Sequence, residues 1–187
     1  MAGHIIYITT PSSLVVLDLD DPLKPRLVQK IEMEDPRASA LQFRYLFVTD
    51  AEGLKVFDAT QPKNIKPVSG AHIALKNPKK LYVARTYAYV AAGSEGLAII
   101  NVKNPEQPKL YKLFNANGKI NDARDVIVGT TNASLFAYVA DGKNGLKVIQ
   151  LTSPDSQPRF YGYSPEPKPE LIACLLYTSD AADDDTR

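Results

Sequence analysis

Three basic residues fall at the same position of a sequence pattern that repeats along the chain. Arg37, Lys79 and Arg124 each lie at the start of an expected strand. Cations that converge on one point can bind a phosphate or carboxylate group through charge-assisted hydrogen bonds. We therefore expect an anion-binding site formed by these three residues. The alternative is a set of solvated rim charges, partly neutralised by nearby carboxylates, namely Asp35, Asp122 and Asp125.

The other residue types that carry chemistry form no recognisable constellation. His4 and His72 lie far apart in the repeat, and Cys174 is the single cysteine, so neither a metal site nor an internal disulfide is expected. The chain also has no Gly-x-Ser-x-Gly nucleophile motif. We expect no catalytic residues, no metal and no cofactor, and thus a protein that is not an enzyme.

Composition narrows the classes of partner. The chain has 187 residues, 44% of them hydrophobic, and a formal net charge of +1. This near-neutral charge argues against nucleic acid as a partner, because nucleic-acid binding relies on excess positive charge. No apolar run approaches the roughly 18 residues of a transmembrane helix. The expected partner is another protein or a small anionic ligand.

The elements that would position the basic residues come from an internal repeat of about 43 residues. Each repeat contains a strand, a turn, a second strand that begins with leucine, and a proline eight residues after that leucine. The four pairs are Leu14 and Pro22, Leu54 and Pro62, Leu97 and Pro105, and Leu146 and Pro154. Glycine precedes the leucine in three repeats, at Gly53, Gly96 and Gly145, as expected for a hairpin turn with positive φ.

A further strand upstream and another downstream give four short strands per repeat, with no helical periodicity. Strands such as 14–17 are apolar throughout, which predicts that both of their faces are buried, whereas Lys55 is expected to point outward. Sheets stacked face to face around an axis explain this pattern. The sequence therefore predicts an all-β protein, a β-propeller with about four blades that belong to a larger ring; a β-sandwich explains the fixed period less well.

The predicted propeller covers residues 1–173, with repeats at about 5–35, 36–77, 78–121 and 122–173. The first repeat lacks its upstream strand. The last strand of the fourth is either Arg159–Tyr163 or Glu170–Ala173. Residues 174–187 break the composition and resemble translated sequencing-adapter sequence, so we interpret them as a non-native tail.

The leucine-initiated strands resemble the signature of the LVIVD-repeat β-propellers. They are Leu-Val-Val-Leu-Asp at 14–18, Leu-Lys-Val-Phe-Asp at 54–58, Leu-Ala-Ile-Ile-Asn at 97–101 and Leu-Lys-Val-Ile-Gln at 146–150. The resemblance implies a bacterial or archaeal protein, often extracytoplasmic and multidomain. It implies no shared catalytic residues. Gln150 stands at the position where the family signature has an aspartate.

These observations together predict a non-catalytic interaction scaffold in a bacterial cell-envelope or secreted protein. The alternative is part of an enzyme or electron-transfer assembly whose active site or cofactor domain lies outside this sequence. Besides the basic residues, two longer connections are candidates for partner contacts, 115–121 and 129–135, because rigid scaffolds carry function on their loops.

Overall fold

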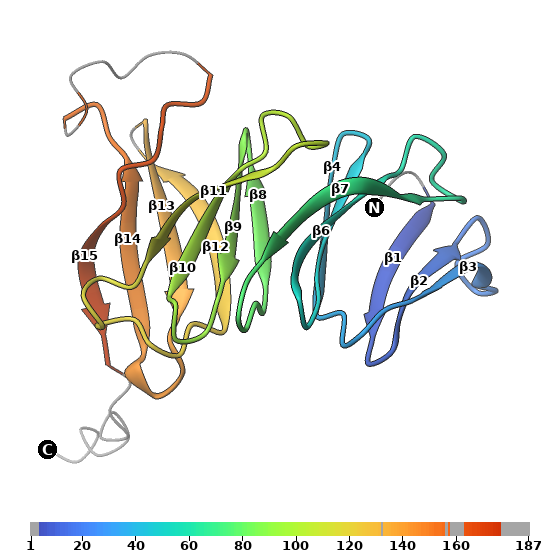
Figure 1. Cartoon of the computed structure of the whole chain (residues 1–187), viewed down its shortest axis with the longest axis horizontal. Helices are drawn as coiled ribbons and strands as arrows, with labels where there is room; N and C mark the ends of the chain where they lie inside the picture. Colours follow the sequence, from blue (N-terminus) through green and yellow to red (C-terminus); the bar gives the residue numbers. More distant parts are fainter. Residues whose placement is uncertain (1–3, 132, 156, 158–162, 177–187) are drawn as a thin grey trace, which may run out of the picture.

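The computed structural model describes residues 4–131, 133–155, 157 and 163–176. These residues form four antiparallel sheets that follow one another in chain order along the long axis of the molecule (Figure 1). We call the sheets blades 1 to 4. Their only described helical element is a 3₁₀ turn at Gly142–Asn144, so the predicted all-β class is confirmed. No helix in the described ranges is long and apolar enough to cross a membrane.

Each blade is a meander in which consecutive strands pair. Blade 1 has three strands, β1 (Ile5–Thr10), β2 (Ser13–Asp18) and β3 (Arg26–Glu32). Blade 2 has four, β4 (Ala38–Gln42), β5 (Tyr45–Thr49), β6 (Gly53–Asp58) and β7 (Lys66–Ala74). Blade 3 has β8 (Leu81–Ala84), β9 (Tyr87–Ala91), β10 (Leu97–Asn101) and β11 (Lys109–Phe114). Blade 4 has β12 (Asp125–Thr131), β13 (Ser134–Ala140), β14 (Leu146–Thr152) and β15 (Glu170–Leu175).

The three glycines that precede the repeated leucine have a second role beside the turn. Gly96 and Gly145 adopt φ values of +78° and +77°, and Gly53 one of +154°. A Cβ atom at any of the three would overlap a carbonyl oxygen of the outermost strand of the same blade, for example Phe114 O next to Gly96. Glycine is therefore required both for backbone conformation and for the close approach of that strand.

The hydrophobic core consists of three layers, one between each pair of consecutive blades. We call the side of a sheet that faces the next blade its forward face and the opposite side its backward face. Forward residues Leu14 and Val16 of blade 1 pack against backward residues of blade 2, namely Leu46, Val48 and Phe57. Side chains alternate along each strand, so the two middle strands of an inner blade contribute to two layers, as β5, β6, β9 and β10 do.

The other two layers repeat this arrangement. Between blades 2 and 3 the forward residues are Phe47, Leu54 and Val56, and the backward residues are Ala88, Val90, Ala98 and Ile100. Between blades 3 and 4 the forward residues are Tyr87, Tyr89, Leu97 and Ile99, and the backward residues are Ala137, Val139 and Ile149. Tyr87 and Tyr89 are 4% and 0% exposed, so both tyrosines are enclosed between blades 3 and 4.

Two details of the predicted burial are wrong. In β2, Leu14 and Val16 are buried but Val15 and Leu17 are only half-buried, because no blade covers the backward face of blade 1. Lys55 does not simply point outward. Its ammonium lies 2.6 Å from Oδ2 of Asp50, a fully buried carboxylate in the β5–β6 turn, and also contacts Glu52. An ion pair with a buried acid keeps this lysine against the sheet.

The C-terminal strand of blade 4 is settled by its pairing. β15 pairs with β14, with Glu170 opposite Gln150 and Leu175 opposite Leu146, so of the two alternatives the segment Glu170–Ala173 forms the last strand. The rival segment falls mainly on residues 158–162, outside the described ranges. The strand continues through Cys174 and Leu175, two residues past the predicted boundary. Their side chains are exposed, and residues 177–187 lie outside the described part of the chain.

Candidate functional site: the basic rim

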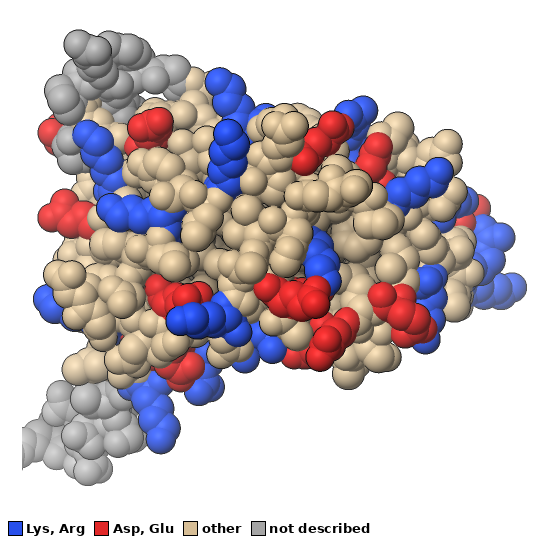
Figure 2. All heavy atoms as spheres, in the orientation of Figure 1, with Lys and Arg blue, Asp and Glu red and all other residues tan. Residues whose placement is uncertain are grey.

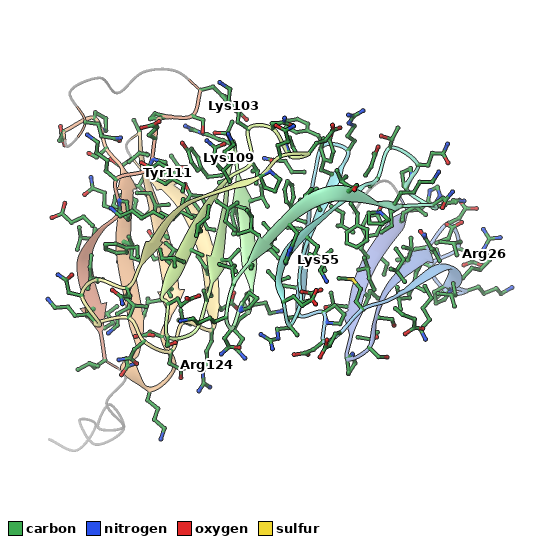
Figure 3. All side chains as sticks on the ribbon, in the orientation of Figure 1. Arg26, Lys55, Lys103, Lys109, Tyr111 and Arg124 are labelled. Carbon is green, nitrogen blue, oxygen red and sulfur yellow. The ribbon has the colours of Figure 1, made fainter. Side chains whose placement is uncertain are left out.

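The three predicted site residues occupy equivalent backbone positions, one in each of blades 2 to 4. Each donates its backbone N–H to the last residue of the second strand of its blade. These bonds run from Arg37 to Thr49 O, from Lys79 to Ala91 O and from Arg124 to Ala140 O, at 2.7, 2.7 and 2.8 Å. Each side chain therefore leaves its blade at the same end. Arg124 lies at the edge of the stack opposite to Lys103 and Lys109 (Figure 3).

The three side chains line one shallow hollow of about 320 Å³. Asp35 and Lys80 complete its lining. We call this hollow and its five lining residues the basic rim. The structure thus brings together residues that are 42 and 45 positions apart in sequence, and it adds Lys80, which the sequence alignment did not single out.

The guanidinium of Arg37 donates hydrogen bonds to three different residues. Its Nε donates to Asp35 Oδ2 at 2.8 Å, and Nη1 donates to Asn77 Oδ1 and to the Pro78 carbonyl at 3.0 and 2.5 Å. The last two acceptors belong to the segment that leads into blade 3, so Arg37 links two blades. With its side chain only 22% exposed, it has few donors left for a ligand.

Arg124 is paired but more accessible. Its Nε and Nη2 lie 3.0 and 2.8 Å from Asp122 Oδ2, while the side chain is 63% exposed. The hydrogen bond from Arg124 lowers the pKa of Asp122, and the charge of Lys79 lowers it further. The same hydrogen bond raises the pKa of Arg124. Asp122 is therefore ionised at neutral pH and competes with any ligand for this guanidinium.

Lys79 and Lys80 make no ion pair with any residue that the structure describes. Lys79 is half-buried between the two arginines, and Lys80 is exposed. Of the three predicted neutralising carboxylates, Asp35 and Asp122 pair with their arginines, whereas Asp125 accepts a bond from the Val126 backbone. The anion site predicted from Arg37, Lys79 and Arg124 stays a prediction, with Lys79 as its freest charge.

Sequence reasoning named Asp35 and Asp122 as neutralising acids, but it missed that an acid or amide lies two residues before each basic residue. Asp35-Pro36-Arg37, Asn77-Pro78-Lys79 and Asp122-Ala123-Arg124 share this spacing, which the repeat alignment already contains. It also missed the ionic contacts at the opposite rim, between the blades. Lys63 of blade 2 lies 2.7 Å from Asp18 of blade 1.

The next junction has the reverse charge order. Glu106 of blade 3 accepts hydrogen bonds from Arg44 and from the Tyr45 hydroxyl of blade 2, at 3.3 and 2.7 Å. Lys63 and Glu106 both follow the repeated loop proline, so one loop position contacts the preceding blade at both junctions.

The two longer connections have different outcomes. Residues 129–135 are mostly strand, because β12 runs to Thr131 and β13 begins at Ser134, so the loop interpretation is wrong there. Residues 115–121 do form a loop. It lines a groove of about 420 Å³ with 169–171 of blade 4, and the groove also includes Lys112 and Lys119. In the described ranges, no group of three or more His, Cys, Asp or Glu side chains is placed to hold a metal ion.

Charges of both signs are interspersed over the face shown in Figure 2. No extended single-sign surface dominates that view. This mixture of charges is in keeping with the net charge of +1.

Comparison with known proteins confirms the repeat. The model of the LVIVD repeat matches residues 79–115 and 122–162, so the chain contains LVIVD repeats in blades 3 and 4. No curated protein sequence matches the chain.

Among solved structures, the crystal structure of the N-terminal domain of Nup159 is similar over 95% of this chain and 43% of its own length. The TM-score is 0.54 and the identity 12%. Hsv2 from Kluyveromyces lactis is similar over 80% of this chain and 43% of its own, with a TM-score of 0.48 and 17% identity. The chain thus spans less than half the length of each. The Nup159 likeness establishes the fold as β-propeller architecture.

Proposed function

We propose that this β-propeller chain is a non-catalytic interaction scaffold of a bacterial cell-envelope or secreted protein, and that its basic rim binds an anionic group of a ligand or partner. The observation that carries the proposal is the convergence of Arg37, Lys79 and Arg124 from three successive blades on one hollow. The propeller holds these positions rigidly, which lowers the entropy lost on binding.

The charge balance of the basic rim favours an anion. Four cations, Arg37, Lys79, Lys80 and Arg124, face one lining carboxylate, Asp35, and Asp122 beside Arg124 adds a second. The excess of positive charge attracts a phosphate or carboxylate group. Because the hollow is open to solvent, screening keeps the interaction weak and salt-dependent.

The three predicted residues have different parts in this proposal. Arg37 is a positioning residue, because its donors are already used by Asp35, Asn77 and Pro78. Lys79 supplies an unpaired ammonium. Arg124 offers the guanidinium N–H groups that Asp122 does not occupy. Lys79 and Arg124 are thus the two direct contacts.

The test is titration of the full chain with inorganic pyrophosphate, followed by NMR shifts or calorimetry at low salt. Lys79→Ala and Arg124→Ala should each weaken binding several-fold. Asp122→Asn should strengthen it, because it releases two donors of Arg124. Lys103→Ala, at the opposite edge of the stack, is the matched control and should bind like the unaltered chain. The proposal fails if Lys79→Ala has no effect, or if Lys103→Ala has the same effect.

A further inference from the structure

Two hollows open at the edge of the stack opposite to the basic rim. One lies at the loop between β6 and β7 of blade 2 and the other at the loop between β10 and β11 of blade 3, with volumes of about 320 and 360 Å³. We call them the blade-2 hollow and the blade-3 hollow. Lys103 and Lys109 of the blade-3 hollow lie at this edge in Figure 3, away from Arg124. Both hollows belong to inner blades, which have a blade packed on each side.

The two hollows use the same positions of the repeat. The blade-2 hollow is lined by Arg44, Asp58, Thr60, Gln61, Asn64 and Lys66. A shift of 43 positions, the distance from Leu54 to Leu97, carries all of these except Arg44 onto the lining of the blade-3 hollow. That lining is Asn101, Lys103, Asn104, Gln107 and Lys109. Asp58 and Asn101 are half-buried, and the other equivalent pairs are exposed. The repeat therefore forms the same hollow twice.

The loops that form the hollows are held by the same hydrogen bonds. In blade 3, Asn101 Oδ1 accepts the backbone N–H of Lys103 at 2.9 Å, and the Asn104 carbonyl accepts that of Gln107 at 3.0 Å. The equivalent bonds of blade 2 are both 2.8 Å long. Because these bonds fix the loops before a ligand arrives, little entropy is lost in ordering them on binding.

A hydrogen-bonded contact joins the two hollows. Arg44 lines the blade-2 hollow, and its Nη2 donates to Glu106 Oε1 at 3.3 Å. Glu106 belongs to the loop of the blade-3 hollow, between Asn104 and Gln107. The Tyr45 hydroxyl donates to the same carboxylate oxygen at 2.7 Å. The two hollows are therefore adjacent, so a ligand longer than one of them can contact both.

The lining combines ammonium groups with side-chain amides. Lys66, Lys103 and Lys109 make no ion pair with any residue in the described ranges. The side-chain amides of Gln61 and Gln107 make no hydrogen bond within the same ranges. An amide offers both donors and an acceptor, which complements hydroxyl groups, since these also donate and accept. An ammonium complements a carboxylate.

From this combination we propose that the two hollows together bind an acidic polysaccharide built of uronate units, with the amides on ring hydroxyls and the lysines on carboxylates. A uronate keeps the ring hydroxyls that the amides need, whereas sulfation would replace them. Four cations, Arg44, Lys66, Lys103 and Lys109, face one lining carboxylate, Asp58. Each contact is weak, because it is exposed to solvent. A polymer occupies both hollows at once, which multiplies the affinity.

Blade 1 has different chemistry at the same positions. A shift of 40 positions, from Leu54 back to Leu14, places Asp18, Asp20 and Asp21 where blade 2 has Asp58, Thr60 and Gln61. The equivalent of Lys66 is Arg26, whose Nη2 already donates to Asp18 at 3.1 Å. Three carboxylates repel an anionic ligand. The loop of blade 1 therefore lacks this binding chemistry, although it belongs to the same repeat.

The experiment is calorimetric titration of the full chain with oligogalacturonate at low salt. The oligomer should bind at least about tenfold more tightly than galacturonate monomer, since it contacts two hollows. Lys66→Ala and Lys109→Ala should each weaken binding of the oligomer about tenfold, because each removes a cation from one hollow. Gln107→Ala should weaken it about threefold through the lost hydroxyl contact. All three side chains are exposed, so the variants should fold.

Lys24→Ala is the matched control, because it removes the same charge from the equivalent loop of blade 1 and should leave binding unchanged. Arg124→Ala should also leave it unchanged, which separates this site from the basic rim. Polyglutamate, an acidic polymer without hydroxyls, should bind at least about tenfold more weakly than the oligomer. The proposal is overturned if the oligomer does not bind, or if Lys24→Ala weakens binding as much as Lys109→Ala. Equal binding of polyglutamate would also overturn it, in favour of an acidic protein partner.

Discussion

Blades 3 and 4 have nearly the same strand pattern but different surroundings. Tyr89 and Ile99 of blade 3 are fully buried, whereas Tyr138 and Val148, at the equivalent positions of blade 4, are half-buried. The difference comes from the presence or absence of a following blade and not from the residue types. The apolar pattern of a strand therefore indicates which of its faces can be buried, while the presence of a neighbouring blade determines whether they are buried.

The largest expected effect tests this difference with one substitution at both sites. Ile99→Asp should lower the free energy of unfolding by about 4 kcal/mol or more, because it buries an unpaired carboxylate between two blades. Val148→Asp should cost about 1 kcal/mol, since its carboxylate reaches solvent. Urea denaturation at low protein concentration measures both. Equal losses would show that the two blades are equally enclosed in solution.

The next effect concerns the close approach between the glycine that precedes the repeated leucine and the outermost strand of the same blade. Gly96→Ala should destabilise the protein by about 3 kcal/mol, because the new methyl group overlaps Phe114 O and φ is positive. Gly70→Ala is the matched control, with a φ of +76° and no atom within 4 Å of the new Cβ, so about 1 kcal/mol is expected. If Gly70→Ala were as costly, backbone conformation alone would explain both glycines.

A smaller effect of opposite sign is expected at Tyr89. Its hydroxyl is buried and has no hydrogen-bond partner among the residues that the structure describes, and burial raises its pKa well above the usual value. Tyr89→Phe should therefore stabilise the protein by about 1 kcal/mol in thermal or urea denaturation. Tyr138→Phe, at the half-buried equivalent position, should be close to neutral. Destabilisation by Tyr89→Phe would indicate a bonded hydroxyl.

The smallest effect is a pH dependence at the junction of blades 1 and 2. The hydrogen bond from Lys63 lowers the pKa of Asp18 below its unfolded value. This stabilisation is therefore present above about pH 4, the ordinary range of an aspartate, and is lost as the pH falls through the lower, folded-state pKa. Asp18→Asn should flatten the acid limb of a plot of Tm against pH. An unchanged acid limb would contradict the contribution of this pair.

Much of the fold could be predicted because the repeat fixes local structure. The leucine-to-proline spacing and the glycines located the hairpins, and the strand period located the core residues such as Leu54 and Val56. The burial of Val15 and Leu17 could not be predicted, since it depends on a neighbouring blade. Nor could the pairing of Lys55 with Asp50, because a turn aspartate is ordinarily solvated.

The candidate site was predictable in position but not in detail. Aligning the repeats brought Arg37, Lys79 and Arg124 to one place, because equivalent positions of stacked blades lie at the same end of the strands. The alignment did not show that two of them are already ion-paired. That depends on side-chain geometry over two residues, between Asp35 and Arg37 and between Asp122 and Arg124.

The reversed charges of the two ionic junctions bear on how similar blades assemble in the correct order. Chains made of like repeats are prone to docking errors, in which one repeat takes the place of another during folding. If blade 3 docked on blade 1, Glu106 would face Asp18 in place of Lys63, and an attraction would become a repulsion. If blade 2 of another copy took the place of blade 3 on blade 2, Lys63 would face Arg44. The order of the charges thus contributes to specificity, because it makes an incorrect order of blades less stable than the correct one.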